Sequence, residues 1–359
     1  MPIVQHIYWF APYNLTCPST RYRGLMPLKK MADRGIQYNF FYPQATFTAY
    51  FHFLYLVLGI LLFRKKNSLI VIQKICSTGL YGRALCWLVR LQPQGTLYDL
   101  DDAEYYRQAT TSLHFFLEHC QWIQVGSHAL AAYARQFNQQ VYINTSPVPL
   151  PIPTKKKKNR PLTIGWVGDF GNGKAISKEF AHKTSLFQLL FPVLKELDFP
   201  IKLVLIGVKC SEDIPLIEAY FEADKHIQLE IPSNLDWTND DWLYDRIATF
   251  DVGLSPLVSH PFNEAKSAFK AKQYLACGVP TIASAVGENA LFVQDYINGI
   301  LCRSAEDWKR ALYYFEAMDE QLYTIYSEQA RASQASFGMT GYIWQLLTII
   351  DHTRIKKDN

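Results

Sequence analysis

The chain has 359 residues, more than one hydrophobic core usually supports, so two domains are expected. Hydrophobic residues make up 49% and charged residues 19%, which excludes a largely disordered protein. The net charge of +4 is mild, and Lys and Arg form no aromatic-interleaved stripe, which argues against a nucleic-acid partner.

The cysteines and the N-terminus indicate the cellular setting. Seven cysteines are scattered without a CxxC pair or a His-rich partner segment, which argues against a zinc site and a disulfide framework. The N-terminus begins with a strand-like run and lacks the basic, apolar and cleavage regions of an export signal. We therefore expect a cytoplasmic protein.

In residues 1–150, short β-branched or aromatic runs alternate with helical segments, a pattern typical of a parallel sheet covered on both faces. The expected strands are Val4–Phe10, Gln37–Tyr42, Leu69–Gln73, Thr96–Leu100, Trp122–Val125 and Val141–Ile143. Residues 1–150 are thus predicted to form an N-terminal doubly wound domain.

The segment Tyr50–Phe63 is almost wholly apolar and is followed by Arg64, Lys65 and Lys66. It is shorter than the ~20 residues that cross a bilayer. Two interpretations stay open: a buried crossover helix, or a helix that dips into a membrane surface with its basic end on anionic headgroups. The second predicts peripheral membrane contact.

Residues 151–160 are predicted to be a linker, because alternating prolines and the lysine run 155–158 pack as neither helix nor sheet. The strand pattern then restarts with Leu162–Val167, Lys202–Ile206, His226–Glu230, Asp251–Leu254, Thr281–Ala283 and Gly299–Leu301. Residues 161–335 are predicted to form a second doubly wound domain, with helical sequence around Trp308–Tyr326. Residues 336–359 form a C-terminal helix and tail.

Residues 266–278 carry the most informative pattern. As one helix, they would place Lys266, Lys270 and Gln273 on a single face. Gly278 fits the position that ends the helix, and Pro280 prevents its continuation. Lysine suits a diphosphate as a mobile point charge, and the glutamine amide suits ribose hydroxyls.

This segment resembles the donor-binding segment of group 1 glycosyltransferases, the GT-B class that includes glycosyltransferase family 4. The matching residues are Lys270, Tyr274, Ala276, Gly278 and Pro280. Gln273 occupies the position of a family glutamate that lies near the ribose. The run 283–287 also matches, which implies that backbone amides at Val286 and Gly287 lie near the sugar or the phosphates.

The resemblance covers most of the chain, including residues 18–23, 98–104, 162–168 and 251–257. It implies an α/β fold of GT-B architecture, with two Rossmann-like parallel-sheet domains facing across a cleft. It also implies an N-terminal acceptor domain, a C-terminal donor domain and a C-terminal helix that crosses back to the N-terminal domain.

Further donor-site candidates follow the strand Leu162–Val167. Gly168 and Asp169 open a glycine-rich turn, residues 168–173, that can bring backbone amides to a phosphate. The turn has neither a P-loop ending nor the dinucleotide fingerprint, which disfavours an NTPase or a dehydrogenase. Among Lys174, Lys178 and Lys183, we prefer Lys183 as a phosphate-binding cation because it precedes an apolar helix stripe.

Acceptor chemistry is expected at Asp101, Asp102 and Glu104, which follow a predicted strand. One of these candidate catalytic carboxylates would act as a general base, although Asp102 would equally fit as a helix cap. Arg21 and Arg23 begin a helix and are candidate acceptor-binding residues, with surface salt bridges as the alternative.

Retaining members of the family commonly carry two glutamates separated by seven residues. Ala265 and Gln273 take these positions in this chain, with Glu264 one position off. The broken pair leaves the choice between retaining and inverting chemistry open.

The sequence thus predicts a glycosyltransferase that moves a sugar from a UDP- or GDP-sugar to a glycan or lipid-linked acceptor hydroxyl, in surface polysaccharide or glycolipid biosynthesis. Lysines and backbone amides would stabilise the leaving group, without a metal or a cofactor. The alternatives are a GT-B-fold sugar-nucleotide epimerase and a non-catalytic nucleotide-sugar or glycan-binding protein. The expected location is cytoplasmic, with peripheral association at the membrane face.

Overall fold

A computed structural model describes residues 4–77, 79–107, 110–149, 153–154, 157–171, 179–233 and 235–355. The predicted linker is described only in part, and Asn172, Gly173, Lys174 and Lys178 lie outside the described residues. The chain divides into two compact units. Unit 1 comprises Met1–Pro149, Ala265–Ser267 and Phe337–Asn359; unit 2 comprises Leu150–Glu264 and Ala268–Ser336.

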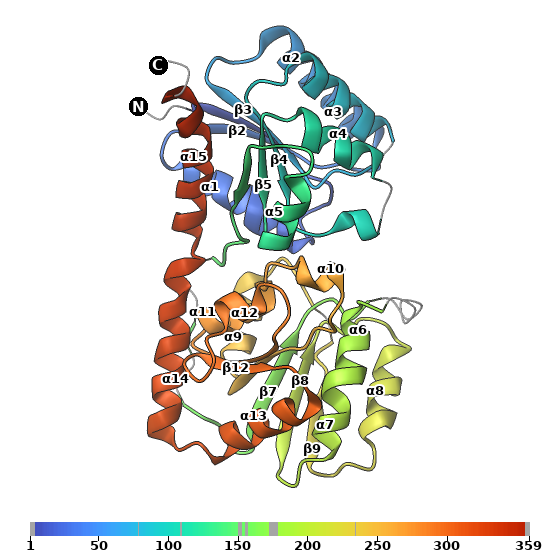
Figure 1. The fold of residues 1–359 in the computed structure, drawn as a ribbon. Coiled ribbons are helices and arrows are strands. Elements are labelled where there is room, and N and C mark those ends of the chain that lie inside the picture. Colours follow the sequence, from blue (N-terminus) through green and yellow to red (C-terminus); the bar gives the residue numbers. More distant parts are fainter. Residues whose placement is uncertain are drawn as a thin grey trace. The chain divides into compact units, whose positions relative to one another are not determined.

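Unit 1 is built on a six-stranded parallel sheet with the order β2-β1-β3-β4-β5-β6 (Figure 1). The strands are β1 (His6–Phe10), β2 (Gln37–Phe41), β3 (Ser68–Gln73), β4 (Thr96–Leu100), β5 (Trp122–Val125) and β6 (Val141–Ile143). Each expected strand of this half is present. Strands β1, β3, β4 and β5 are almost wholly buried, because helices cover both faces of the sheet and leave no solvent side.

The helices of unit 1 lie on both faces of this sheet (Figure 1). On one face, α1 (Met26–Ala32) and α15 (Met339–Ile355) share a core with the sheet, which confirms that the C-terminal helix returns to the N-terminal unit. On the other lie α2 (Phe47–Phe63), α3 (Leu80–Leu91) and α4 (Thr111–His119). A π-helical turn, Thr20–Leu25, precedes α1, and α5 (His128–Ala134) connects β5 to β6.

Unit 2 repeats the plan with a six-stranded parallel sheet of order β12-β11-β10-β7-β8-β9. Its strands are β7 (Leu162–Val167), β8 (Ile201–Ile206), β9 (Ile227–Glu230), β10 (Val252–Ser255), β11 (Thr281–Ser284) and β12 (Gly299–Cys302). The expected strands of the second half are therefore present as well. Together the two sheets confirm the predicted class of two doubly wound α/β halves.

The helices of unit 2 are mostly short. They are α6 (His182–Ser185), α7 (Phe191–Lys195), α8 (Asp213–Phe221), α9 (Asp240–Ile247), α10 (Pro261–Glu264), α11 (Phe269–Ala276), α12 (Asn289–Phe292), α13 (Ala305–Ala317) and α14 (Glu320–Ala332). The sequence expected around Trp308–Tyr326 is divided between α13 and α14. Asp319 separates them, because its side chain accepts a hydrogen bond from the Leu322 amide and so caps α14.

Candidate functional site

Helix α11 begins later than the sequence suggested. Ala268, just before it, has a left-handed backbone with φ 53°, so Lys266 lies outside the helix. The prediction that Lys266 shares a helix face with Lys270 and Gln273 is therefore wrong, because a left-handed residue interrupts the helical register.

The predicted end of α11 is confirmed. Gly278 has φ 68°, and its amide donates to the Leu275 carbonyl at 2.9 Å. The next amide, that of Val279, donates to the Tyr274 carbonyl at 3.0 Å. This pair of bonds is the Schellman motif, and only glycine adopts its left-handed position without a steric cost.

Tyr274 fixes α11 on the sheet. Its hydroxyl accepts a hydrogen bond from the Val167 amide at 2.9 Å and donates to the Leu254 carbonyl at 3.2 Å, which links the ends of β7 and β10. Gly253 makes room for the ring, since a Cβ there would come within 2.2 Å of it. The tyrosine of the matched motif therefore holds the helix at the carboxyl end of the strands.

Lys270 lies over the end of β7. A Cβ at Gly168 would come within 2.5 Å of the Lys270 Cε, so the lysine side chain passes directly over this glycine. The Lys270 Nζ lies 2.7 Å from His182 Nε2 and 5.8 Å from the centre of the Trp166 ring. Asp169 accepts a hydrogen bond from the Gly171 amide at 3.1 Å and shapes the turn. The structure thus brings Gly168, Asp169 and Lys270 together.

Gln273 lies in the buried part of α11, with 3% of its surface exposed. Its amide nitrogen donates to the Tyr244 hydroxyl at 3.4 Å. The side chain is thus directed toward α9, where it contacts protein.

The loop that contains Val286 and Gly287 packs against the end of α10. The Gly287 amide donates to Glu264 Oε2 at 2.6 Å, and a Cβ at Gly287 would come within 2.6 Å of the Glu264 carbonyl oxygen. Gly287 also has φ 54°, which glycine adopts most readily. Glu264, one position away from the family spacing, therefore holds this loop in place.

Lys183 does not join the Lys270 group. Its ammonium pairs with Asp213 in a buried contact and lies 5.6 Å from the centre of the Phe170 ring. Lys183 thus forms a buried ion pair in unit 2, and its role as a phosphate ligand stays a prediction.

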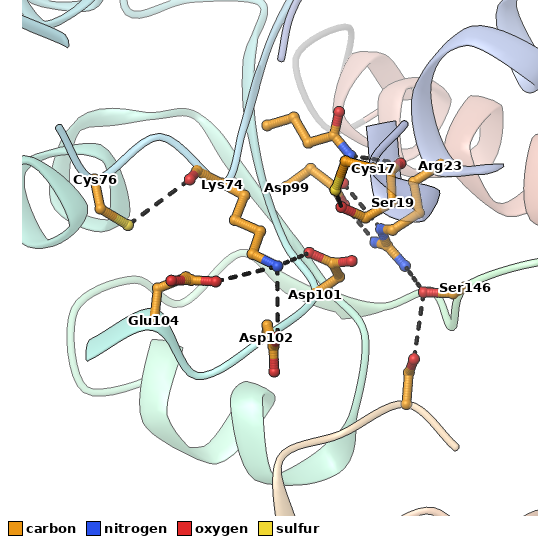
Figure 2. A network of polar contacts seen from close by, with 12 residues as sticks. Cys17, Ser19, Arg23, Lys74, Cys76, Asp99, Asp101, Asp102, Glu104 and Ser146 are labelled. Carbon is orange, nitrogen blue, oxygen red and sulfur yellow. Dashed lines mark hydrogen bonds and ion pairs between the residues drawn. The ribbon is translucent and has the colours of Figure 1, made fainter. Parts of the chain in front are cut away.

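In unit 1, the three predicted carboxylates surround Lys74 (Figure 2). The Lys74 Nζ lies 3.4 Å from Asp101 Oδ1, 3.5 Å from Asp102 Oδ2 and 3.1 Å from Glu104 Oε1. Lys74 directly follows β3 and has a left-handed backbone with φ 50°, an uncommon state for a lysine that is typical of functional sites. Asp102 caps no helix, because the following 3₁₀ turn has no side-chain cap. Lys74 was missed by the sequence reasoning.

The cluster gives its members different acidities. Burial would lower the pKa of Lys74, but the three carboxylates raise it well above the ordinary lysine value. Burial raises the pKa of Asp101 against the opposing effect of Lys74. Burial would also raise the pKa of Asp102, but Lys74, Lys266 and Arg107 outweigh it and hold that pKa below its usual range. Asp102 is therefore ionised at neutral pH.

Lys266 belongs to this cluster because Ala265–Ser267 is part of unit 1. Ser127, the N-cap of α5, donates from its hydroxyl to the Ala265 carbonyl at 2.7 Å. The Ser267 hydroxyl lies 3.3 Å from that of Ser146. Burial lowers the pKa of Lys266 to about 8, against the attraction of Asp102. The structure thus places Lys266 beside the predicted carboxylates.

Arg23 is buried and serves the structure of unit 1. Its guanidinium pairs with Asp99 through two nitrogens, one of them at 2.9 Å (Figure 2). It also donates to the Asn144 carbonyl at 2.8 Å. Its side chain is 0% exposed, so the expected acceptor contact has no support in this geometry. Arg21 is also buried and donates to the Leu15 carbonyl at 2.7 Å.

Across the described ranges, no group of three or more His, Cys, Asp or Glu side chains has the arrangement needed to hold a metal ion. Metal independence stays a prediction.

No protein-family model and no curated protein sequence matches this chain. Solved structures are similar to it. Sucrose-phosphate synthase from Thermosynechococcus elongatus aligns over 98% of this chain and 100% of its own, with 15% identity and a TM-score of 0.70. Anabaena HepE in complex with UDP and glucose aligns over 97% and 100%, with 12% identity and a TM-score of 0.62. The lipopolysaccharide outer core galactosyltransferase WaaB aligns over 97% and 99%, with 11% identity and a TM-score of 0.64. The chain therefore has the two-domain α/β fold of GT-B glycosyltransferases.

Proposed function

We propose that the protein is a glycosyltransferase that moves a sugar from a nucleotide diphosphate sugar to an acceptor hydroxyl. The observation that carries this proposal is the position of Lys270 over Gly168 at the carboxyl end of β7. Ligands of parallel α/β sheets bind at this edge, and a lysine beside a glycine turn suits a diphosphate.

The donor would lie in unit 2. Lys270 and the backbone amides near Gly168, Asp169, Val286 and Gly287 would stabilise the charge that develops on the diphosphate as its bond to the sugar breaks. The His182 imidazole, 2.7 Å from the Lys270 ammonium, would help to hold that cation in position. Gln273 would reach the ribose only by exchanging its contact with Tyr244.

The acceptor would lie at the Lys74 cluster of unit 1. Asp102 is the most accessible of the three carboxylates, with 20% of its side chain exposed against 9% for Asp101 and 2% for Glu104. As an ionised carboxylate it would accept a hydrogen bond from the acceptor hydroxyl and take its proton as the new glycosidic bond forms. Lys74 and Lys266 would keep it ionised.

The finer assignment concerns the acceptor and its location. We propose a glycan or a lipid-linked sugar at the cytoplasmic membrane face, in surface polysaccharide or glycolipid biosynthesis. The similarity to WaaB, a lipopolysaccharide outer core galactosyltransferase, supports this choice of acceptor class. UDP is the first donor nucleotide to test, because the similar HepE structure holds UDP and glucose.

The test is nucleotide binding, measured by thermal shift and calorimetry with UDP and GDP. Selective binding raises the melting temperature. Lys270→Ala should weaken binding about tenfold or more, because it removes a charged contact to the diphosphate. Lys225→Ala, a change at an exposed lysine of the same unit, is the matched control. The donor site is wrong if neither nucleotide stabilises the protein or if Lys270→Ala binds as tightly as the wild type.

Incubation with UDP- and GDP-sugars then separates the three activities. Release of the nucleotide diphosphate with transfer to an added glycan supports the transferase. Conversion of the sugar without release indicates an epimerase, and binding without conversion indicates a non-catalytic protein.

A further inference from the structure

Helix α2 buries only one narrow side. Phe53, Val57 and Ile60, spaced four and three residues apart, face the sheet. The opposite side exposes large apolar side chains, with Phe47 79%, Tyr55 77%, Leu58 55%, Leu62 70% and Phe63 80% exposed. The helix carries no charged residue at all. The outer side of a surface helix normally carries polar residues that face water. The outer side of α2 carries large apolar residues, so it is suited to an apolar environment.

Helix α3 packs beside α2 and extends this apolar surface (Figure 1). The side-chain amide of Gln92, at the end of α3, donates to the carbonyls of Ile60 and Leu61 at 3.2 and 3.1 Å and so joins the ends of the two helices. On α3, Leu80, Trp87 and Leu91 are exposed. We call the exposed side chains of Phe47–Phe63 and Leu80–Leu91 the α2–α3 face.

The segment that forms both helices carries only basic charge, although the neighbouring helix α4 contributes the exposed Glu118. Residues 34–98 contain no Asp or Glu and seven Lys or Arg. Five of these are exposed, namely Arg34, Lys65, Lys66, Arg83 and Arg90. The Arg90 guanidinium lies 6.0 Å from the centre of the Trp87 ring. An apolar surface with a basic border matches the interface of an anionic bilayer, where acyl chains take the apolar groups and headgroups take the cations.

A second copy of the chain is a poor occupant of the same face, since two copies would bring the basic residues of both 34–98 segments together. No helix in the part of the chain that the structure describes has the length and apolar content to cross a bilayer. Tryptophan at the border of an apolar surface is typical of proteins that stop at the membrane interface.

We propose that the α2–α3 face docks on the surface of an anionic lipid bilayer, with the outer sides of both helices in the interface. This goes beyond the proposed function, because docking requires no catalysis and is measured without any substrate. In a protein with a lipid-linked acceptor, such docking would bring the acceptor to the Lys74 cluster of the same unit.

The test is co-sedimentation of the full chain with vesicles of phosphatidylcholine alone and of phosphatidylcholine with 30% phosphatidylglycerol. Binding is expected to the anionic vesicles and to weaken as salt is added, since screening weakens the attraction between cations and headgroups. The triple variant Tyr55→Ser, Leu62→Ser, Trp87→Ser should lower the partition coefficient about tenfold or more. Its three sites are exposed, so folding should survive, and circular dichroism checks this.

The matched control is Leu216→Ser, Ile325→Ser, Trp344→Ser, which removes three apolar side chains that are exposed elsewhere. It should bind as the wild type does. A separate double variant, Arg83→Gln with Arg90→Gln, should lose the preference for anionic vesicles. Equal binding by the wild type and the Tyr55, Leu62, Trp87 variant would overturn the proposal. So would a dimer in light scattering that this variant abolishes while vesicles bind no protein.

Discussion

At the scale of single residues, Lys74 is the centre of unit 1's charge cluster. Its side chain is 8% exposed and faces three carboxylates. Lys74→Met would leave those carboxylates without their shared cation, and breaking a buried ion pair in this way costs about 3–5 kcal/mol. We expect a loss of stability of that order in urea unfolding followed by circular dichroism.

Two further variants test this prediction. Lys66→Met changes an exposed lysine at the other end of β3 and should leave the unfolding midpoint almost unchanged. Adding Asp101→Asn to Lys74→Met should restore part of the loss, because it removes one uncompensated charge. An unchanged midpoint for Lys74→Met would mean that the cluster does not stabilise the fold.

Lys266 gives a prediction about pH. Burial lowers its pKa to about 8, so its charge is present below that pH and is lost as the pH rises through it. If this charge positions the acceptor beside Asp102, kcat/KM for glycosyl transfer should fall above about pH 8. Asp102, whose pKa is held low, should contribute no loss of activity in the neutral range.

Lys266→Arg should remove this alkaline fall, because the guanidinium stays protonated throughout the accessible range. Lys266→Met should show low activity that no longer depends on pH near 8. An alkaline fall that persists unchanged in Lys266→Arg would assign the titration to another group.

At the scale of elements, Tyr342 attaches α15 to the interior of unit 1. Its hydroxyl accepts a hydrogen bond from the side-chain amide of Gln124 at 3.0 Å and donates to the Arg23 backbone carbonyl at 3.0 Å. Tyr342→Phe keeps the ring but leaves these buried partners unpaired, which costs about 1–3 kcal/mol. Urea unfolding measures the loss. Trp344→Phe, on the exposed side of the same helix, should be close to neutral, and equal effects of both changes would contradict this role.

The strands and the end of α11 were predictable because local chemistry determines them. Strands buried on both faces read as apolar runs, and Gly278 followed by Pro280 marks a helix end. The start of α11 was not predictable. Ala268 carries no turn signal, and its left-handed backbone appears only in the folded chain, where Ala265–Ser267 is held by hydroxyls of Ser127 and Ser146.

At the scale of the whole molecule, the sequence likewise predicted only part of the candidate site. Asp101, Asp102 and Glu104 were found because side chains that follow parallel strands gather at one sheet edge. Lys74 follows the neighbouring strand β3, so the same rule could have found it. Two further contacts join residues that lie far apart in sequence, namely Arg23 with Asp99 and Lys183 with Asp213. No local sequence pattern signals such partners.

The C-terminal segment completes the core of unit 1. Residues 337–359 belong to unit 1, and α15 supplies Met339, Tyr342, Ile343, Leu346, Ile349 and Ile350 to its core. Burial of each large apolar side chain contributes about 1.5–3 kcal/mol, so the joint removal of six costs about as much as the 5–15 kcal/mol that typically stabilises a domain. The chain without residues 337–359 should therefore bind the dye ANS strongly and lose the cooperative unfolding of unit 1.

A synthetic peptide of residues 337–359 added in trans should reverse both effects, whereas the same peptide with Leu346→Asp should not. Cooperative unfolding of the shortened chain without ANS binding would show that unit 1 folds without α15.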